Sequence, residues 1–335
     1  MFNKSKVFTA FGALICMLGL VLLVGCATAR TTQQEAGQQK ELDVIKIPDI
    51  HMPTYLYSPY IAEAKGFFAE EGIKPQFTGM IPPGQHVAAV ASGTNDVGYL
   101  HVNRTIAGIA GGAKIKAVAA DTLTTKDFPH MEFVVLENSP LKKPADIIGK
   151  KVGIIAMGGC NEYTPYEILA KNGISDPKGK FEFVVIPIGN EEQALRSGQV
   201  DVVGYHGHPA DMFKRGGVRV LFNDYDVWGT VGGSCPWYFT EKFIKEKPDV
   251  VRRFVRAMAK TTDWINAHQQ EAIEIQAQRL NFDAQKIVPM YFAEHALIKE
   301  DTVQVWLDIL KKYGEIKEYA PSSIYTNEFN DYANK

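Results

Sequence analysis

The chain has 335 residues, 46% of them hydrophobic, and carries a formal net charge of -2 at pH 7. This length exceeds that of one average domain and predicts two domains with buried cores. The near-neutral charge, with no basic stripe in the sequence, argues against a nucleic-acid-binding protein.

Lys4 and Lys6 precede an apolar run that ends at Gly25 and Cys26, and this order is typical of a secretory signal. The Gly25–Cys26 ending resembles a bacterial lipobox, in which the cysteine is acylated. We therefore predict a signal peptide over 1–25, lipidation of Cys26, and a polar, flexible tether over 26–41. These features place the protein in the periplasm or at the cell surface, anchored to a membrane by lipid. The alternative is a transmembrane anchor, because about 19 apolar residues are enough to span a bilayer.

Beyond the tether, short β-rich runs alternate with helical patterns, which is typical of α/β domains with mostly parallel sheets. Strands are predicted over 44–47, 96–100, 115–120, 151–156, 181–186, 200–204, 218–222 and 236–240, where the chain crosses back. Helices are predicted over 58–72, 83–91, 105–110, 190–197, 249–268, 271–280, 284–295 and 302–313, and after a capping box that begins at Thr164.

The order of these elements predicts two lobes joined by two crossings of the chain. Residues 42–138 are expected to begin the first lobe, and the largely helical residues 240–335 to return to it. Residues 139–239 are expected to form the second lobe. Each lobe is predicted to be a mixed, mostly parallel sheet flanked by helices, with a ligand cleft between the lobes.

Five segments, taken in order, carry a resemblance to a known family. The segments are 57–73 (YSPYIAEAKGFFAEEGI), 91–98, 148–153, 194–201 and 247–254. Together they resemble solute-binding proteins for sulfonates, taurine, nitrate and thiamine-pyrimidine precursors. The resemblance implies a two-lobed periplasmic-binding-protein fold. It also implies capture of a small molecule for the permease and ATPase of an ABC importer, and we expect a monomer.

Candidate ligand residues follow from the rule that ligands bind beyond the carboxyl ends of strands in such sheets. Aromatic rings can stack on a planar ligand, and their polar groups can orient it. Glycines before a helix allow an anion to approach free N–H groups. The predicted ligand-binding residues are Tyr55, Tyr57, Gln85, His86, His101, Asn103, Gly158, Gly159, Cys160, Asn161, Tyr163, His206, His208 and Trp237.

The histidines and cysteines leave alternatives open. His206 and His208 form an H-x-H pair that, with a thiolate, would suit zinc or copper. We nevertheless predict no metal site, because the flanking glycine and proline indicate a loop and no carboxylate shares the cluster. The histidines then either bond an organic ligand or are structural. Cys160 and Cys235 either form a disulfide or remain free thiols near the cleft.

The ligand class has two alternatives. A small organic anion, such as an alkyl sulfonate, taurine or nitrate, is favoured slightly by its frequency in the family and by the 158–163 loop. A planar heterocycle, such as a pyrimidine precursor of thiamine, is favoured by the Tyr, His and Trp residues, and by the scarcity of cations other than Arg104. The sequence contains no nucleophile elbow, GxxxxGK or HExxH motif. We therefore predict no enzyme, catalytic residue or cofactor, with a surface sensor as a further alternative.

Overall fold

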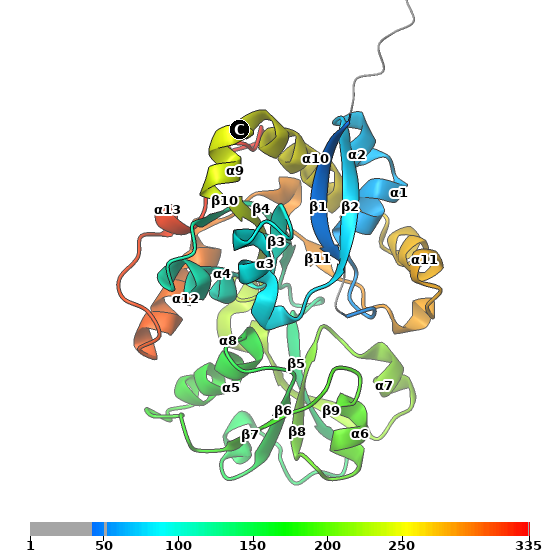
Figure 1. The fold of residues 1–335 in the computed structure, drawn as a ribbon. Coiled ribbons are helices and arrows are strands. Elements are labelled where there is room, and N and C mark those ends of the chain that lie inside the picture. Colours follow the sequence, from blue (N-terminus) through cyan, green and yellow to red (C-terminus); the bar gives the residue numbers. More distant parts are fainter. Residues whose placement is uncertain (1–41, 50–51, 334) are drawn as a thin grey trace, which may run out of the picture. The chain divides into compact units, whose positions relative to one another are not determined.

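Strands from distant parts of the chain form three sheets in the computed structural model, which describes residues 42–49, 52–333 and 335. They belong to one structural unit, Lys40–Lys335 (Figure 1). The predicted signal peptide, the tether and Cys26 lie outside the described residues. Within the described part of the chain, no helix is long and apolar enough to cross a membrane.

The first lobe contains two sheets. Its two-stranded sheet pairs β1 (Asp43–Asp49) in parallel with β2 (Ile73–Met80). Its four-stranded sheet is antiparallel between neighbours and has the order β11 (Tyr291–Phe292), β4 (Ile115–Leu123), β10 (Cys235–Thr240) and β3 (Val97–Tyr99).

The second lobe is built on the five-stranded sheet in the lower part of Figure 1. Its central strands, β6 and β8, are parallel, whereas β5 runs antiparallel to both of its neighbours. The strand order is β7 (Glu182–Val185), β6 (Lys151–Ile154), β8 (Val202–His206), β5 (Met131–Leu136) and β9 (Val218–Asn223). Its helices are α5 (Cys160–Lys171), α6 (Glu191–Arg196), α7 (Ala210–Lys214) and α8 (Asp224–Trp228).

Helix α10 (Pro248–Ala267) is the central support of the first lobe. It buries Val251, Phe254 and Met258 completely, at the three- and four-residue spacing of one helix face. Arg253 of the same helix donates to the Asp43 carboxylate over 2.6 Å and so holds the start of β1. The remaining helices of this lobe are α1 (Ser58–Ala64), α2 (Phe67–Glu70), α3 (His86–Ala91), α4 (Val102–Ala110), α9 (Glu241–Glu246), α11 (Gln269–Leu280), α12 (Glu300–Lys312) and α13 (Pro321–Ile324).

The α/β prediction is confirmed, but the strand directions and the predicted lobe boundaries need correction. Three of the described strand pairings are parallel and five are antiparallel, so the sheets are not mostly parallel. The main reason is that β5 and β10 lie where the chain passes between the lobes, and each is antiparallel to both of its neighbours. Strand β5 pairs in the second lobe although it lies in 42–138, and β10 pairs in the first although most of it lies in 139–239.

Several predicted elements differ in the structure. The helix expected over 58–72 divides into α1 and α2, because Gly66 adopts a left-handed φ of 78° between them. Strands β2 and β5 were not predicted. The helix expected over 284–295 is also wrong, since two short 3-10 turns, Ala284–Lys286 and Glu294–Ala296, flank β11 there. Asn266 stabilises this extended backbone by bonding both the N–H and the carbonyl of Phe292.

One buried side chain holds the loop between β1 and α1 against α11. The Gln276 amide donates to the carbonyls of Tyr55, over 2.8 Å, and Pro53, over 3.1 Å. Its carbonyl oxygen accepts from the Tyr57 N–H over 2.7 Å. Gln276 is completely buried, so no bulk water competes for these backbone groups.

We predict that Gln276→Ala lowers the free energy of unfolding by about 3 kcal/mol, since each buried polar group left without a partner costs about 1–3 kcal/mol. Urea unfolding would measure the change. The matched control is Gln270→Ala, which alters an exposed glutamine that bonds only Glu274. Equal stability of the two variants would contradict a structural role for Gln276.

Candidate functional site

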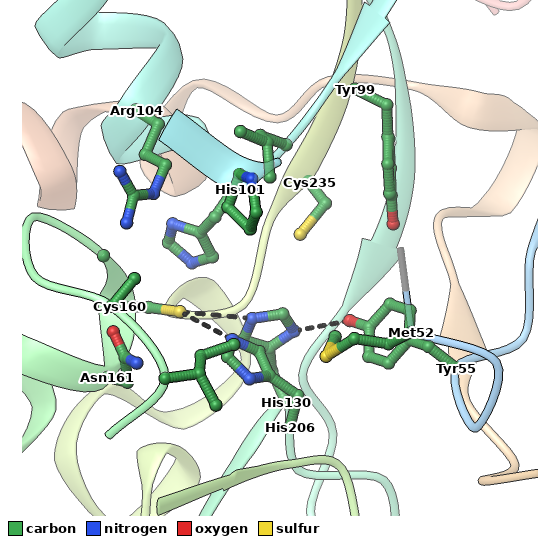
Figure 2. A pocket seen from close by; sticks show the side chains of 15 residues that line it. Met52, Tyr55, Tyr99, His101, Arg104, His130, Cys160, Asn161, His206 and Cys235 are labelled. Carbon is green, nitrogen blue, oxygen red and sulfur yellow. Dashed lines mark hydrogen bonds between the residues drawn. The ribbon is translucent and has the colours of Figure 1, made fainter. Parts of the chain in front are cut away.

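A small cavity lies where the two lobes meet, with a volume of about 50 Å³. It is bounded by the ends of β1, β3, β6 and β8, the start of β10 and the start of α5 (Figure 2). Its volume admits only a few water molecules. The lining residues are Met52, Tyr55, Pro83, Tyr99, Leu100, His101, Arg104, His130, Ile155, Ala156, Gly159, Cys160, Asn161, His206 and Cys235.

His130 is the residue through which both lobes meet in this cavity. Its Nδ1 is 2.9 Å from the Tyr55 hydroxyl of the first lobe. Its Nε2 is 3.4 Å from Cys160 Sγ of the second lobe, and His206 Nε2 lies 3.5 Å from the same sulfur. Figure 2 shows both imidazoles facing the sulfur. The ring centre of His101 is 5.1 Å from that of His130. We call His101, His130, His206 and Cys160 the imidazole–thiol cluster.

His101 is fixed at the start of α4. Its Nε2 lies 2.9 Å from the Gly232 carbonyl. Its Nδ1 accepts from the backbone N–H of Asn103 and lies 3.0 Å from the Asn103 side-chain oxygen. His101 is therefore the N-cap of this helix as well as a lining residue. Both ring nitrogens have protein partners, so the ring orientation is set before any ligand enters.

The start of α5 differs from the prediction. The helix begins at Cys160, with Gly159 as N-cap, rather than at Thr164. Thr164 lies inside the helix and donates to the Cys160 carbonyl over 2.7 Å. The helix can begin early because the Glu162 carboxylate accepts from the Gly158 N–H over 2.5 Å, which closes the loop.

Gly159 also makes room for Arg104. A Cβ at position 159 would lie 3.2 Å from Arg104 Nη2 and 2.8 Å from the Asn161 side-chain oxygen, a distance that real Cβ atoms do not tolerate. Arg104 donates to the Met157 carbonyl over 2.7 Å. The guanidinium therefore lies against the helix start, the place where an anion would be held.

Burial keeps the cluster uncharged. Desolvation lowers the pKa of His101 to about 4 and that of His130 well below its usual value, so both rings are neutral at pH 7. The same cause raises the pKa of the Cys160 thiol, and that of Cys235 to about 12. Both cysteines are buried and free, not disulfide-bonded. Among the described lining residues, Arg104 is the one with a fixed charge.

Some of the predicted site residues come together at this cavity. Six of them line it: Tyr55, His101, Gly159, Cys160, Asn161 and His206. Asn103 and Gly158 lie immediately behind them, joined by a bond from the Asn103 amide to the Gly158 carbonyl over 3.1 Å. These two residues support the lining without forming it.

The other predicted aromatic residues are core residues. Tyr57 bonds the Pro48 carbonyl through its hydroxyl and packs on Trp237, which is completely buried. Tyr163 packs among Trp306 and Tyr313. The residues have the chemistry expected of a binding surface, but their rings fill space between helices and sheets.

The remaining predicted residues lie outside the cavity lining. Gln85 is exposed, and His86 Nε2 lies 2.9 Å from the Ile81 carbonyl. His208 Nδ1 lies 2.8 Å from the Glu132 carboxylate, which raises the His208 pKa. The expectation that no carboxylate would accompany the H-x-H pair is therefore wrong. It failed because Glu132 comes from β5, a strand that was not predicted.

His130 is the most important residue that sequence reasoning missed. It directly precedes β5, and Met131 pairs with His206 of β8. Because β5 was not predicted, His130 was not recognised as a neighbour of His206. A histidine before the apolar run 131–136 was the available signal. Tyr99, Met52 and Cys235 also line the cavity.

Two buried carboxyl groups lie behind the cavity. Asp121 on β4 accepts a hydrogen bond from Ser58 over 2.5 Å. Asp224 accepts from the Met131 N–H over 3.0 Å and from Thr124. Burial raises the pKa of each to about 7, although the hydrogen bonds act in the opposite direction.

This raised pKa predicts a pH-dependent stability. Between about pH 4 and pH 7 the folded protein keeps a proton on Asp121 that the unfolded chain releases, so stability falls as pH rises through this window. We expect the free energy of unfolding of Asp121→Asn to fall less steeply with pH than that of the wild type. The decrease that remains would come from Asp224. Urea unfolding at several pH values measures it, with the exposed Asp127→Asn as control. An unchanged slope in Asp121→Asn would rule out this assignment.

Comparison with known proteins identifies relatives along most of the chain. A family described as NMT1/THI5 like matches residues 53–272. The formylaminopyrimidine-binding protein of Halalkalibacterium halodurans is 25% identical over 272 residues, which cover 79% of this chain and 78% of that protein. The 4-amino-5-hydroxymethyl-2-methylpyrimidine phosphate synthase THI5 of Saccharomyces cerevisiae is 22% identical over 308 residues, covering 84% and 85% of the two chains.

Solved structures show the same fold. The periplasmic aliphatic sulphonate binding protein SsuA of Escherichia coli matches with a TM-score of 0.67 and 16% identity, covering 86% of this chain and 99% of that one. A ligand-binding component of an ABC-type import system from Staphylococcus aureus, solved with zinc bound, matches with a TM-score of 0.70 and 16% identity, covering 87% and 99%. The chain thus has the two-lobed periplasmic-binding-protein fold, and it belongs to the NMT1/THI5-like family.

Proposed function

We propose that this protein is the substrate-binding component of an ABC importer, and that it holds a small, uncharged, nitrogen-containing planar molecule between its lobes. The observation that carries this proposal is the imidazole–thiol cluster. His101 and His130 are neutral hydrogen-bonding groups in a site largely removed from water. A neutral imidazole has one donor and one acceptor nitrogen, so exchanging one present protein partner for a ligand atom would suit a heterocycle with ring nitrogens and amino groups.

The relatives support the same ligand class. One relative is named as a formylaminopyrimidine-binding protein and another as a synthase of a pyrimidine phosphate. Tyr55 and Tyr99 offer aromatic faces at the cavity, and such faces can stack on a planar ring. A pyrimidine would thus meet both stacking and hydrogen-bonding groups.

A small organic anion, such as a sulfonate, taurine or nitrate, is the second candidate. It is favoured by one feature, the placement of Arg104 against the start of α5. The sulphonate-binding protein SsuA has the same fold. We rank the anion second, because the Arg104 guanidinium already donates to the Met157 carbonyl and the other lining groups carry no fixed charge.

Binding would require the lobes to move. Sites for organic ligands commonly measure about 300–1,000 Å³, whereas this cavity measures about 50 Å³. The Tyr55–His130 hydrogen bond spans the lobes, and opening the cleft would break it. Ligand contacts from both lobes would then favour the closed form, which is a hinge closure. The closed form is the one we expect the permease to recognise.

We propose that the protein acts outside the cytoplasm as a monomer held to the membrane by lipid on Cys26, and that its partners are a permease and an ATPase. We also propose that it is not an enzyme. Relatives named as synthases are 22–31% identical and those named as binding proteins 22–25%, so identity does not separate the two roles. The argument against an enzyme is that the Cys160 thiol is protonated at pH 7 and the cluster offers no activated nucleophile.

Thermal unfolding of the purified protein tests the ligand class. A compound that binds the folded state raises the melting temperature according to its concentration relative to Kd. We expect a shift with 4-amino-5-hydroxymethyl-2-methylpyrimidine that exceeds the shifts with an alkyl sulfonate, taurine and nitrate. A shift with the anions alone would replace the heterocycle by the second candidate, and no shift with any organic compound would overturn both.

The cluster itself is tested by His130→Gln. Loss of one buried hydrogen-bonding partner costs about 1–3 kcal/mol, so ligand affinity should fall roughly 5- to 150-fold. The matched control is His268→Gln, since His268 is exposed and stacks on Trp264 away from the cavity. Isothermal titration calorimetry measures both variants, and equal affinities would exclude His130 from the binding site.

The lipid anchor is tested by Cys26→Ser in the producing bacterium. We expect mass spectrometry of the wild-type protein to find Cys26 as the lipid-bearing first residue, and the variant to keep an unmodified, uncleaved N-terminus, because the serine cannot take the thioether-linked lipid. Cys16→Ser, within the predicted signal peptide, is the control and should be processed normally. A wild-type protein that keeps residues 1–25 and carries no lipid would favour the transmembrane alternative.

A further inference from the structure

We propose that the imidazole–thiol cluster also binds one soft metal ion, with His101, His130 and Cys160 as protein ligands and zinc as the expected ion. This inference goes beyond the proposed capture of an organic molecule. It differs from the metal alternative considered for His206 and His208, because it draws on three segments that only the fold brings together.

The donor atoms are close enough to share one ion. Each of the three residues offers one ligand atom, and these atoms all lie within 4.8 Å of one another, in side chains that are all buried. Two imidazoles and one thiolate are the donor types that zinc and copper(I) prefer. His206 Nε2, also 3.5 Å from Cys160 Sγ, is near enough to approach the remaining position.

The sulfur–nitrogen distances fit a tetrahedral centre. Zinc bonds sulfur at about 2.3 Å and imidazole nitrogen at about 2.0–2.1 Å, so tetrahedral angles would separate the two donors by about 3.5 Å. The distance from Cys160 Sγ to His130 Nε2 is 3.4 Å. Cys160 and His130 would therefore need little movement to take up the ion, and His101 would approach from within 4.8 Å.

The alternative is a hydrogen-bonded cluster without metal. A thiol is a weak donor and a weak acceptor, yet a single thiol faces both His130 and His206 in this buried place. An ion would replace these weak contacts by strong bonds. Tyr55 holds the second nitrogen of His130, an outer bond of the kind that metal-binding histidines commonly have. At His101 the ion would replace one of two present partners, the Gly232 carbonyl at Nε2 or Asn103 at Nδ1, and the other would remain as the outer bond.

Metal binding has a defined proton balance. The ion binds the thiolate, so Cys160 must release its proton to solvent as the metal–sulfur bond forms. One thiolate and two neutral imidazoles leave a net charge of +1 on a divalent site. No oxidation or reduction takes part in this step.

The test is equilibrium dialysis of the purified protein against zinc ion, after removal of bound metal with a chelator. We expect one tightly held zinc per chain. Cys160→Ser and His130→Gln should each weaken binding at least about 100-fold, because loss of outer-shell partners alone costs about 10- to 100-fold. His208→Gln is the matched control, since His208 bonds Glu132 instead of the cluster, and it should retain wild-type affinity.

Three results would overturn the proposal: no stoichiometric zinc, zinc retained by both cluster variants, or zinc lost equally from the His208 variant. Far-ultraviolet circular dichroism of each variant excludes unfolding as the cause of lost binding, and Cys160→Ala provides a second substitution if the serine variant is unfolded. The organic panel is repeated with chelator present. Pyrimidine binding that persists there leaves the proposed function standing even where zinc binding fails.

Discussion

The hydrogen bond between Tyr55 and His130 is the contact on which the arrangement of the site depends. It spans 2.9 Å between the two lobes and lies beside the single sulfur of Cys160. Because these groups are buried, they must be neutral or bound to an ion, and each donor needs a partner. That requirement explains the low pKa of the imidazoles and the high pKa of the thiol.

Residues around the cavity hold Tyr55, His101 and Arg104 in position. Gln276 holds the backbone that carries Tyr55, and Asn103 and the Gly232 carbonyl hold His101. Gly159 allows the Arg104 guanidinium to lie against the start of α5. Each is buried or sterically confined, so the orientation of the lining side chains is set by contacts within the protein.

This combination fits a protein that closes on its ligand. Lining side chains that are already oriented keep the ordering cost of binding low, and a cavity of about 50 Å³ at the meeting of two lobes indicates a closed arrangement. A metal ion would need no opening as wide as an organic molecule would. The two proposed ligand classes would therefore differ in how far the lobes must part.

Much of the fold was readable from the chain. Apolar periodicity located most strands and the long helices α10, α11 and α12, and the rule on carboxyl ends of strands led to Tyr55, His101 and Cys160. The main failure at the site concerns strand β5 and His130. The apolar run 131–136 could have been recognised as a strand, but no local feature shows that it pairs with β8 and so brings His130 beside His206.

The amino-acid sequence by itself determined the α/β class, the family and the strand-end segments from which the cavity is built. Tertiary structure alone decided which side chains in those segments face one another. Tyr57, Trp237 and Tyr163 have the same chemistry as the lining residues, yet they pack into the core. His130 joins the cavity because β5 pairs with β8. Side-chain chemistry is local, whereas burial and proximity depend on strand pairings between residues far apart in the chain.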